Sequence, residues 1–281
     1  MKKLVPIFAV IVVLTIVLSG AAPSRPAGLD AFLPSAPKPN VTEPVTITWW
    51  GHATFKLESG GKTVIIDPWI TDNPKCPIEA EDITAADLVL VTHDHFDHVD
   101  VRDVITITQQ TGATVVAMFE VAARLQADGL PTEYVLNDGA GRNIGGAIEV
   151  EGISLVMTAA FHSAATGSPA GYIIKFPGGA TIYHAGDTGI FASMQLYAAL
   201  YPMHVALLPM GGVFTMDAME AAKSLKLLRP AVAMPMHYGT FPMLAQSADE
   251  FVNLAKKEAP RVEVIVLEPG ESYTLERGFY R

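Results

Sequence analysis

Seven consecutive residues, Thr92-His93-Asp94-His95-Phe96-Asp97-His98, constrain this chain more than any other part of its sequence. Three imidazoles and two carboxylates stand within six residues, a density that neither a hydrophobic core nor an ordinary surface loop explains. Imidazole and carboxylate groups are the usual protein ligands of Zn²⁺ and similar divalent ions. We therefore interpret this segment as metal-binding.

The spacing within the segment has a geometric meaning. On an extended or turning backbone, residues i and i+2 can point to one side, so His93 and His95 can share one ion. Asp97 and His98 would begin the next helix and can reach a second ion nearby. Four groups cannot fill two coordination spheres, so the sequence predicts further ligands elsewhere in the chain.

Three candidates follow expected strands at residues 153–158, 181–184 and 231–235; they are His162, Asp187 and His237. In layered α/β folds, ligands gather in the crevice outside the carboxyl ends of strands. Taken singly, a histidine after a strand is more often structural. Because all three share this placement with the main segment, we predict that they converge on it.

The rest of the chain predicts an α/β fold with two similar halves, each with strands first and helices after. The expected strands are 45–50, 53–58, 63–66, 87–91, 114–117, 133–136, 147–151, 153–158, 172–176, 181–184, 205–208, 231–235 and 262–267. The expected helices are 99–110, 120–128, 191–200, 216–228 and 248–257. Strands 53–58 and 63–66 are expected to form a hairpin across Gly60-Gly61. Two sheets packed face to face, with helices outside, would bury these apolar strands on both sides.

The first residues are typical of a targeting signal. Lys2 and Lys3 precede an apolar stretch at residues 4–18, and small residues follow it. This pattern predicts a secretory signal peptide over residues 1–22 and export to the periplasm or the exterior. The stretch is shorter than the ~20 residues of a comfortable membrane span. An uncleaved anchor formed by residues 4–18, with membrane association through it, remains the alternative.

Residues 23–44 are rich in Pro and Ala and are expected to form a linker, which leaves residues 45–281 as the folded domain. The formal net charge of −10 disfavours a nucleic-acid partner, because such binding depends on Lys and Arg neutralising phosphates. The single cysteine, Cys76, excludes an internal disulfide framework and a cysteine-rich zinc module. The domain must therefore be stabilised by its core.

The pattern His93-x-His95-x-Asp97-His98, with the three later ligands, resembles the metallo-β-lactamase superfamily. The surrounding sequence is similar to its UlaG-like branch of metal-dependent hydrolases, from about residue 45 to the C-terminus. The matching pieces are Trp50-Gly51-His52-Ala53, Ile66-Asp67-Pro68, Tyr183-His184-Ala185-Gly186-Asp187-Thr188, Leu208-Pro209-Met210-Gly211-Gly212 and Met236-His237-Tyr238. The resemblance implies a four-layer αββα sandwich.

The resemblance also implies how seven side chains hold two ions. His93, His95 and His162 would hold one ion, Asp97, His98 and His237 the other, and Asp187 would bridge both. We expect zinc, with manganese or iron as alternatives.

Some positions depart from relatives in this superfamily. Cys76 lies far in sequence from the ligand positions, so no counterpart of a metal-binding cysteine exists. Flavin-partnered diiron relatives replace the second histidine of the segment with glutamate, whereas this chain keeps His95. His204 stands where the UlaG-like branch leads us to expect an acidic residue, and its role is left open.

The expected reaction is hydrolysis of a small ester, lactone or phosphoester by a hydroxide bridging the two ions, with Asp97 orienting it and accepting its proton. One alternative is a phospholipase-type phosphodiesterase that acts on lipid at the membrane face. Another is a non-catalytic metal-binding protein that retains the fold. A nuclease is disfavoured by the acidic balance, and a redox role would require iron. The substrate and the oligomeric state are left open.

Other residues are assigned roles around this centre. His52 is expected to contact substrate or protonate the leaving group, or else to bind a backbone carbonyl at a strand end. Asp67 is expected to accept a hydrogen bond from a ligand histidine and so fix its tautomer. His184 could take either the role expected of His52 or the role expected of Asp67. An apolar cleft is expected from Trp49, Trp50, Phe214, Tyr238 and Phe241, although at least one of the two adjacent tryptophans should lie in the core.

Overall fold

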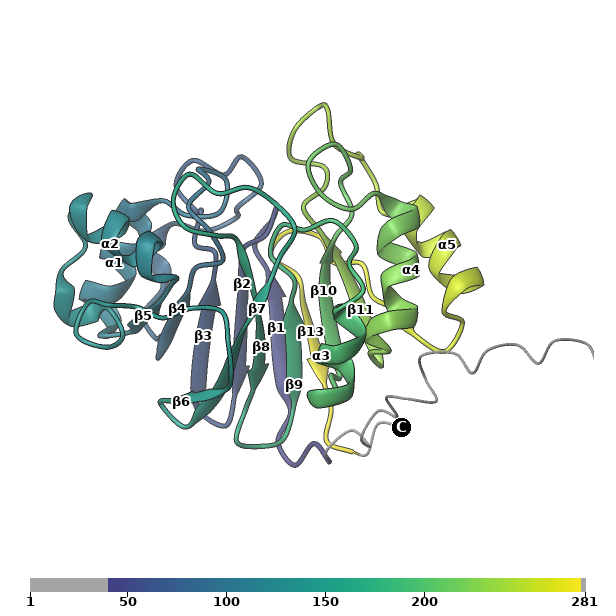
Figure 1. Ribbon diagram of the computed structural model, residues 1–281, viewed down its shortest axis with the longest axis horizontal. Coiled ribbons are helices and arrows are strands. Elements are labelled where there is room, and N and C mark those ends of the chain that lie inside the picture. Colours follow the sequence, from purple (N-terminus) through teal and green to yellow (C-terminus); the bar gives the residue numbers. More distant parts are fainter. Residues whose placement is uncertain (1–39, 279–281) are drawn as a thin grey trace, which may run out of the picture. The chain divides into compact units, whose positions relative to one another are not determined.

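The computed structural model describes residues 40–278, which contain two β-sheets and five α-helices (Figure 1). The first sheet has the strand order β13-β1-β2-β3-β4-β5. Its strands are β1 (Val45–Trp49), β2 (Phe55–Ser59), β3 (Lys62–Ile66), β4 (Leu88–Leu90), β5 (Thr114–Val116) and β13 (Ser272–Leu275).

The second sheet has the strand order β12-β11-β10-β9-β8-β7-β6. Its strands are β6 (Ile148–Val150), β7 (Ile153–Ala159), β8 (Ala170–Lys175), β9 (Thr181–His184), β10 (Val205–Pro209), β11 (Val232–Met236) and β12 (Glu263–Val264). Strands β9, β10, β11 and β12 pair parallel, whereas the pairs β6–β7, β7–β8 and β8–β9 are antiparallel.

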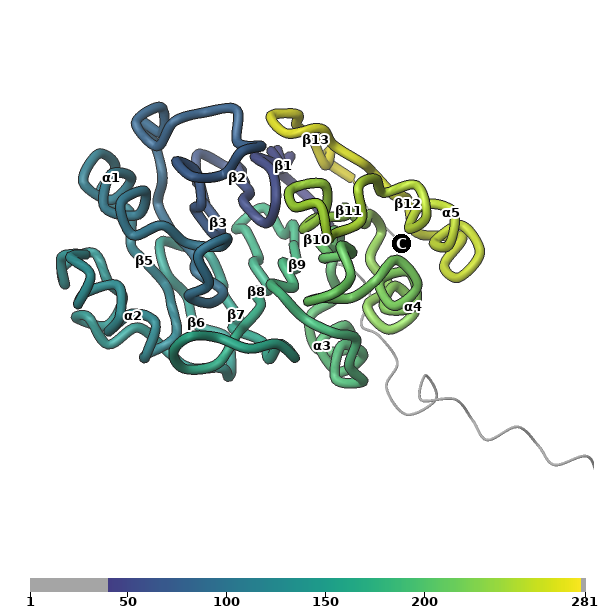
Figure 2. The backbone as a smooth tube through the Cα atoms, turned by 90° about the horizontal axis from the view of Figure 1, so that it is seen from above, coloured from purple at the N-terminus to yellow at the C-terminus, as the bar shows by residue number. Residues whose placement is uncertain are grey.

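The helices lie on the outer sides of the two sheets (Figure 2). Helices α1 (Val101–Thr111) and α2 (Phe119–Ala127) lie against the β4–β5 end of the first sheet. Helices α3 (Met194–Leu200), α4 (Ala218–Leu228) and α5 (Asp249–Glu258) cover the second sheet. This arrangement confirms the predicted αββα sandwich.

Strand β10 shows how the layers are built. Val205 and Leu207 point into the core between the two sheets, whereas Ala206 and Leu208 point into the core beneath α3, α4 and α5. Successive side chains of a strand face opposite ways, so a strand that is apolar at every position can serve two cores. The continuous apolar runs of the sequence are therefore explained by burial on both faces.

Several elements differ from the sequence prediction. Residues 133–136 form a 3₁₀ turn (Thr132–Tyr134) and a single bridge from Val135 to Val115 rather than a strand. Strand β13 was not predicted; its Ser-Tyr-Thr-Leu sequence is short and partly exposed, and pairing with β1 forms it. Helix α1 begins at Val101 because the side chain of Asp100 accepts a hydrogen bond from the backbone N–H of Arg102.

The expected hairpin is confirmed. Strands β2 and β3 pair antiparallel, with Ser59 opposite Lys62. The two residues between them, Gly60 and Gly61, have φ of 58° and 75°, the left-handed values that a two-residue hairpin turn requires.

Part of the segment expected to be a linker packs against the folded domain. Val41 is buried and pairs with Gly278. The expected signal peptide, residues 1–22, and most of the linker lie outside the described residues. Within residues 40–278, the helices are too short or too polar to cross a membrane.

The carboxyl ends of the key strands meet at one edge of the sandwich. Strand β1 is antiparallel to β2, which is antiparallel to β3, and β4 runs parallel to β3. In the second sheet, β7, β9, β10 and β11 share one direction. The loops that follow these strands gather at the top of Figure 1. All the predicted site residues lie on or beside these loops.

Candidate metal centre

The first group of predicted ligands comes from the loops after β4 and β7. The Nε2 atom of His93 lies 2.9 Å from Nδ1 of His95. The ring of His162 lies 5.3 Å from that of His93 and 5.2 Å from that of His95. One nitrogen from each of these three rings can be chosen so that all lie within 4.8 Å of one another, which suits a single ion.

The second group joins the same segment to the loops after β1 and β11. It contains Asp97, His98 and His237, and His52 lies within the same 4.8 Å limit. The Oδ2 atom of Asp97 is 3.2 Å from Nε2 of His52 and 3.9 Å from Nε2 of His237. The sequence assigned the first three residues to one ion; the structure adds the His52 ring to them.

Asp187, in the loop after β9, lies between the two groups. Its Oδ1 atom is 3.2 Å from Nε2 of His98. Its Oδ2 atom is 3.0 Å from Nε2 of His237 and 3.4 Å from Nε2 of His162. One carboxylate thus reaches both groups, and the structure brings all seven predicted ligand residues together.

Several atoms of this cluster are buried without a hydrogen-bond partner among the described residues. They include Nε2 of His98, Oδ1 of Asp187 and Nε2 of His237, whose ion-pair contacts at 3.0–3.2 Å lack the geometry of a hydrogen bond. Leaving such groups unpaired costs about 1–3 kcal/mol each, so buried polar atoms normally have a partner. Imidazole and carboxylate are the donors that zinc, manganese and iron accept. The residues therefore fit the binding of divalent metal.

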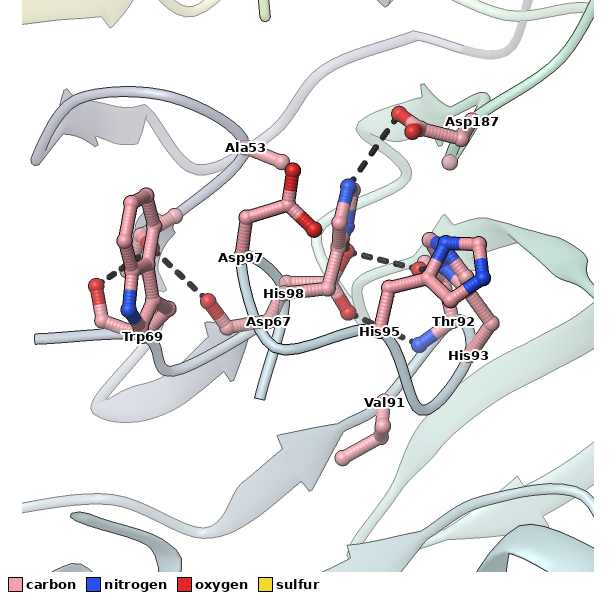
Figure 3. A network of polar contacts seen from close by, with 12 residues as sticks. Ala53, Asp67, Trp69, Val91, Thr92, His93, His95, Asp97, His98 and Asp187 are labelled. Atoms are coloured by element: carbon pink, nitrogen blue, oxygen red, sulfur yellow. Dashed lines mark hydrogen bonds and ion pairs between the residues drawn. The ribbon is translucent and has the colours of Figure 1, made fainter. Parts of the chain in front are cut away.

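Asp67 supports the cluster from below (Figure 3). One oxygen accepts the backbone N–H of Thr92, and the other accepts the Thr92 hydroxyl and Nδ1 of His98, each at 2.7 Å. With its Nδ1–H directed to Asp67, His98 presents Nε2 to the cluster. Asp67 therefore occupies the position that its predicted tautomer-fixing role requires.

The electrostatics of the cluster centre on His98, which lies between two carboxylates. Burial disfavours its charged form, but Asp187 and Asp67 outweigh burial and raise the pKa of His98 well above its ordinary value. Burial likewise opposes the charge of Asp187, yet His98 and His237 lower the pKa of that carboxyl well below its usual range. Without metal, the cluster is therefore held together by charge pairing around His98.

His52 is fully buried, and both of its ring nitrogens are in contact with polar groups. Nδ1 lies 3.0 Å from the Thr240 hydroxyl and Nε2 lies 3.2 Å from Asp97. The ring shows no exposed surface to a substrate and no bond to a backbone carbonyl, so neither role predicted from the sequence fits. The structure instead places it behind Asp97.

The backbone at His52 and His237 is unusual. Both residues have positive φ, 53° and 57°, which is uncommon for residues other than glycine. The carbonyl of His52 accepts the N–H of His237 at 2.9 Å, so a loop of the first sheet is bonded to a loop of the second. Gly211 lies against this junction: a Cβ there would stand 2.0 Å from the His237 carbonyl oxygen. Only glycine allows that approach.

His184 requires a correction. It is the last residue of β9 and is fully buried, and both of its ring nitrogens contact backbone groups: Nε2 lies 3.0 Å from the Ala53 carbonyl, and Nδ1 accepts the N–H of Gly186. Its ring also packs on Phe55, with centroids 5.7 Å apart. Because its side chain points into the protein, between the sheets, it neither orients a ligand nor faces the centre. It fastens the start of the loop that carries Asp187.

Sequence reasoning missed the role of Asp94. Its carboxylate accepts the backbone N–H groups of Ala165 and Thr166 and the Thr166 hydroxyl, at 2.6–3.1 Å. It therefore fastens the 160–169 loop, which supplies His162, to the main histidine segment. The signal was present in the sequence as the second carboxylate of the segment, but its partners lie 71 and 72 positions away.

The predicted aromatic cleft is only partly present. Trp49 and Trp50 are both in the core, and Tyr238 stacks on Trp49 with ring centroids 5.3 Å apart. Phe214 is 56% exposed, and Phe241 contacts the His52 ring, with centroids 5.5 Å apart. His204 is buried near the other ends of the strands, where its Nδ1 accepts the N–H of Thr181, so it takes no part in the centre.

Comparison with known proteins supports a single family. The family model described as "Beta-lactamase superfamily domain" matches residues 46–237. A protein of Nitratidesulfovibrio vulgaris named "UPF0173 metal-dependent hydrolase" is 48% identical over 231 residues, which cover 82% of this chain and 95% of that protein. A protein of the same family name from Lawsonia intracellularis is 44% identical over 230 residues, covering 82% and 99%.

Solved structures show the same fold. Igni18, described as a novel metallo hydrolase from Ignicoccus hospitalis, matches with a TM-score of 0.74 and 40% identity over 83% of this chain and 99% of that one. The isothiocyanate hydrolase from Delia radicum gut bacteria matches with a TM-score of 0.67 over 84% and 100%, but at 19% identity this likeness shows the fold alone.

The contacts of Asp94 lead to a first prediction. Replacing Asp94 by Ala should release the 160–169 loop and weaken metal binding by the His162 group about 10- to 100-fold, as loss of an outer partner typically does. Metal analysis after dialysis against graded chelator would measure this, and limited proteolysis should cleave the loop faster. The control is Asp72→Ala, which removes a carboxylate whose side chain is 67% exposed. Equal metal retention in the two variants would contradict the prediction.

The buried imidazoles lead to a second prediction, for the metal-free protein. Burial lowers the pKa of His52 to about 4 and lowers those of His93, His162 and His184 below their ordinary value of 6.5. Among the histidines of residues 40–278 whose pKa departs clearly from its ordinary value, only His98 has a raised pKa. Below pH 6.5 the unfolded chain therefore binds more protons than the folded one, and stability falls.

The expected change in the free energy of unfolding between pH 6.5 and 5 is about 1.4 kcal/mol per pH unit for each net proton. Urea denaturation of chelator-treated protein at several pH values would measure it, since most carboxylates stay ionised over that window. A urea midpoint that rises or stays constant towards pH 5 would contradict the prediction, because the raised pKa of His98 would then outweigh the lowered pKa values of the other histidines.

Proposed function

The chain belongs to the metallo-β-lactamase superfamily of metal-dependent hydrolases, and we propose that it uses two divalent ions to hydrolyse a small ester, lactone or phosphoester. The observation that carries the proposal is the cluster of seven buried or half-buried side chains, in which buried atoms of His98, Asp187 and His237 make ion-pair contacts but no hydrogen bond of good geometry. His93, His95 and His162 would hold one ion, and Asp97, His98 and His237 the other. Asp187 would bridge them, and zinc is the ion that we propose.

The accessible side of the cluster supports a reactive centre rather than a structural one. His93, His98, Asp187 and His237 are almost completely buried. His95, Asp97 and His162 are half-buried and so lie at the surface of the cluster. Structural metal sites are closed, whereas catalytic ones keep an open side. A substrate can therefore approach across His95, Asp97 and His162.

When bound, such ions lower the pKa of water and polarise the bond under attack. Asp97 is the residue that we propose to accept the proton of the attacking water and to deliver it to the leaving oxygen. Burial opposes its charge, but the hydrogen bond from His52 and the nearby His98 lower the pKa of Asp97 below its usual range. The carboxylate is thus ionised at neutral pH, as a proton acceptor must be.

His52 would act through Asp97 rather than on the substrate. Its Nε2 atom holds Oδ2 of Asp97, and the Thr240 hydroxyl at Nδ1 restricts the rotation of the ring. Because Oδ2 is held from behind, the orientation of the whole carboxylate is fixed before substrate arrives. We therefore assign His52 as a positioning residue.

A test of Asp97 follows. Asp97→Asn keeps the shape of the side chain but removes its ability to accept a proton, so hydrolysis should fall about 10²- to 10⁴-fold. A panel of chromogenic carboxylic esters, lactones and phosphodiesters, assayed with protein of measured metal content, would also identify the reaction class. Asp72→Asn controls for loss of a carboxylate outside the cluster, because the side chain of Asp72 is 67% exposed. Retention of more than half the activity by metal-loaded Asp97→Asn would refute the assigned role.

A test of His52 uses its partner. Thr240→Val removes the hydroxyl at Nδ1 without changing the volume of the side chain much, and we expect a 10- to 100-fold loss of hydrolysis or metal affinity. His52→Gln should lose at least as much, because Asp97 then lacks its fixed partner. The matched control is Thr42→Val, whose hydroxyl bonds the Gly178 carbonyl at the opposite edge of the sandwich. If Thr240→Val behaves like this control, His52 does not position Asp97.

A further inference from the structure

The loops around the metal centre carry an unusual set of side chains. These loops, named here the site loops, are residues 50–54, 67–76, 92–100, 160–169, 185–193, 210–217 and 237–248. Of the 19 Lys and Arg residues in the chain, the site loops contain only Lys75. Of the 12 Phe residues they contain five, namely Phe96, Phe161, Phe191, Phe214 and Phe241. The surroundings of the centre are therefore aromatic and almost free of side-chain cations.

Three of these aromatic side chains form a continuous wall beside Asp97. Trp69, Phe96 and Phe241, named here the aromatic triad, have ring centroids 6.0–6.1 Å apart in every pair. The rings of Trp69 and Phe241 also contact His52, with centroids at 5.3 and 5.5 Å. Figure 3 draws Trp69 on the Asp97 side of the network, with His93 and His95 on the other. The triad thus adjoins the proposed proton acceptor.

The exposure within the triad is graded. Trp69 is 3% exposed and Phe96 is 70% exposed, and Phe241 is intermediate. An isolated exposed phenylalanine needs no explanation, but one that extends a packed aromatic cluster from the core to a reactive centre is a surface for ligand contact. A side chain as apolar as Phe96 would be stabilised by an apolar group covering it.

A second apolar wall lies beside His162. Phe161 is 65% exposed and packs on Phe191 with ring centroids 5.0 Å apart. Val213 is 71% exposed, and its φ of 61° is a strained value for a β-branched residue. The backbone of the next residue, Phe214, is hydrogen-bonded to the ring of His162. Strain of this kind persists where the surrounding structure maintains it and often marks a functional site.

The charges around the centre limit which substrates fit. Sites that recognise phosphate or carboxylate groups typically use arginine, whose fork binds two oxygens, or lysine. The site loops contain no arginine, and Asp94 and Asp217 add negative charge to them, whereas Asp72 and Asp100 pair with Arg102 just outside them. An anionic group placed away from the reacting bond would therefore find Lys75 as the only cationic side chain of these loops, whereas an uncharged apolar group would find two walls.

We propose that the substrate is an uncharged ester or lactone bearing an apolar acyl or aryl group of several carbons, which packs on the aromatic triad. This inference rests on the proposed hydrolytic function for its reaction, but the binding of the apolar group does not depend on turnover. The aromatic triad holds the group beside Asp97, so that the bond to be broken lies over His95, Asp97 and His162.

The test measures binding of uncharged 1-alkanols, from butanol to octanol, to the full chain with and without added zinc, by ligand-observed NMR. Each buried methylene should improve the affinity about two- to fourfold. Phe96→Ala should flatten this dependence, and Phe96→Tyr should restore it. Leu196→Ala is the matched control, because Leu196 is 44% exposed on α3 and lies outside the site loops. The metal content and melting temperature of each variant show whether the centre and the fold are intact.

The outcomes separate the two proposals. A normal alkanol dependence without hydrolysis of any ester refutes the proposed reaction but retains the apolar site. Hydrolysis that is equal for acetyl and octanoyl esters, or alkanol binding unchanged in Phe96→Ala, overturns the inference. It is also overturned if Phe96→Ala, but not Leu196→Ala, reduces binding to phosphatidylcholine vesicles or changes the molar mass measured by light scattering. The triad would then contact a membrane or a second copy of the chain.

Discussion

The buried carboxylate of Asp67 is the contact on which the rest of the centre depends. It stands at the end of β3, and its two oxygens accept three hydrogen bonds, from the backbone and hydroxyl of Thr92 and from His98. These bonds fix the first residue of the histidine segment and the tautomer of its last. The positions of the side chains between them follow from a loop that is anchored at both ends.

Around that anchor, the centre concentrates groups that repel one another as well as groups that attract. Six imidazoles, from His52, His93, His95, His98, His162 and His237, lie within a few ångströms of two carboxylates, Asp97 and Asp187. Burial lowers the pKa of His52, His93 and His162 and so favours their neutral form, whereas the carboxylates of Asp187 and Asp67 raise the pKa of His98. Neutral imidazoles with directed lone pairs are the form that binds metal, so burial itself prepares the ligands.

How much of the centre could be predicted from the sequence depends on how far apart in the sequence the interacting residues lie. The convergence of the proposed ligands was predictable because each follows an apolar strand, and the parallel strands bring their ends to one edge. Asp67 was predictable from its place after β3. The contacts of Asp94 with residues 165–166 and of His52 with Thr240 were not, because they join loops far apart in sequence and carry no periodic pattern. His184 was misassigned because a strand-end histidine can face either way.

The ligands come from both halves of the sandwich. The segment 93–98 extends from the first sheet, and His162, Asp187 and His237 extend from the second. A cation bound by residues of both sheets would link the two halves, because the sheets could not separate without releasing the ion. At a free ion concentration 100 times the dissociation constant, this linkage adds about 2.7 kcal/mol to the free energy of unfolding. The stability of the folded chain would then depend on the free metal concentration around it.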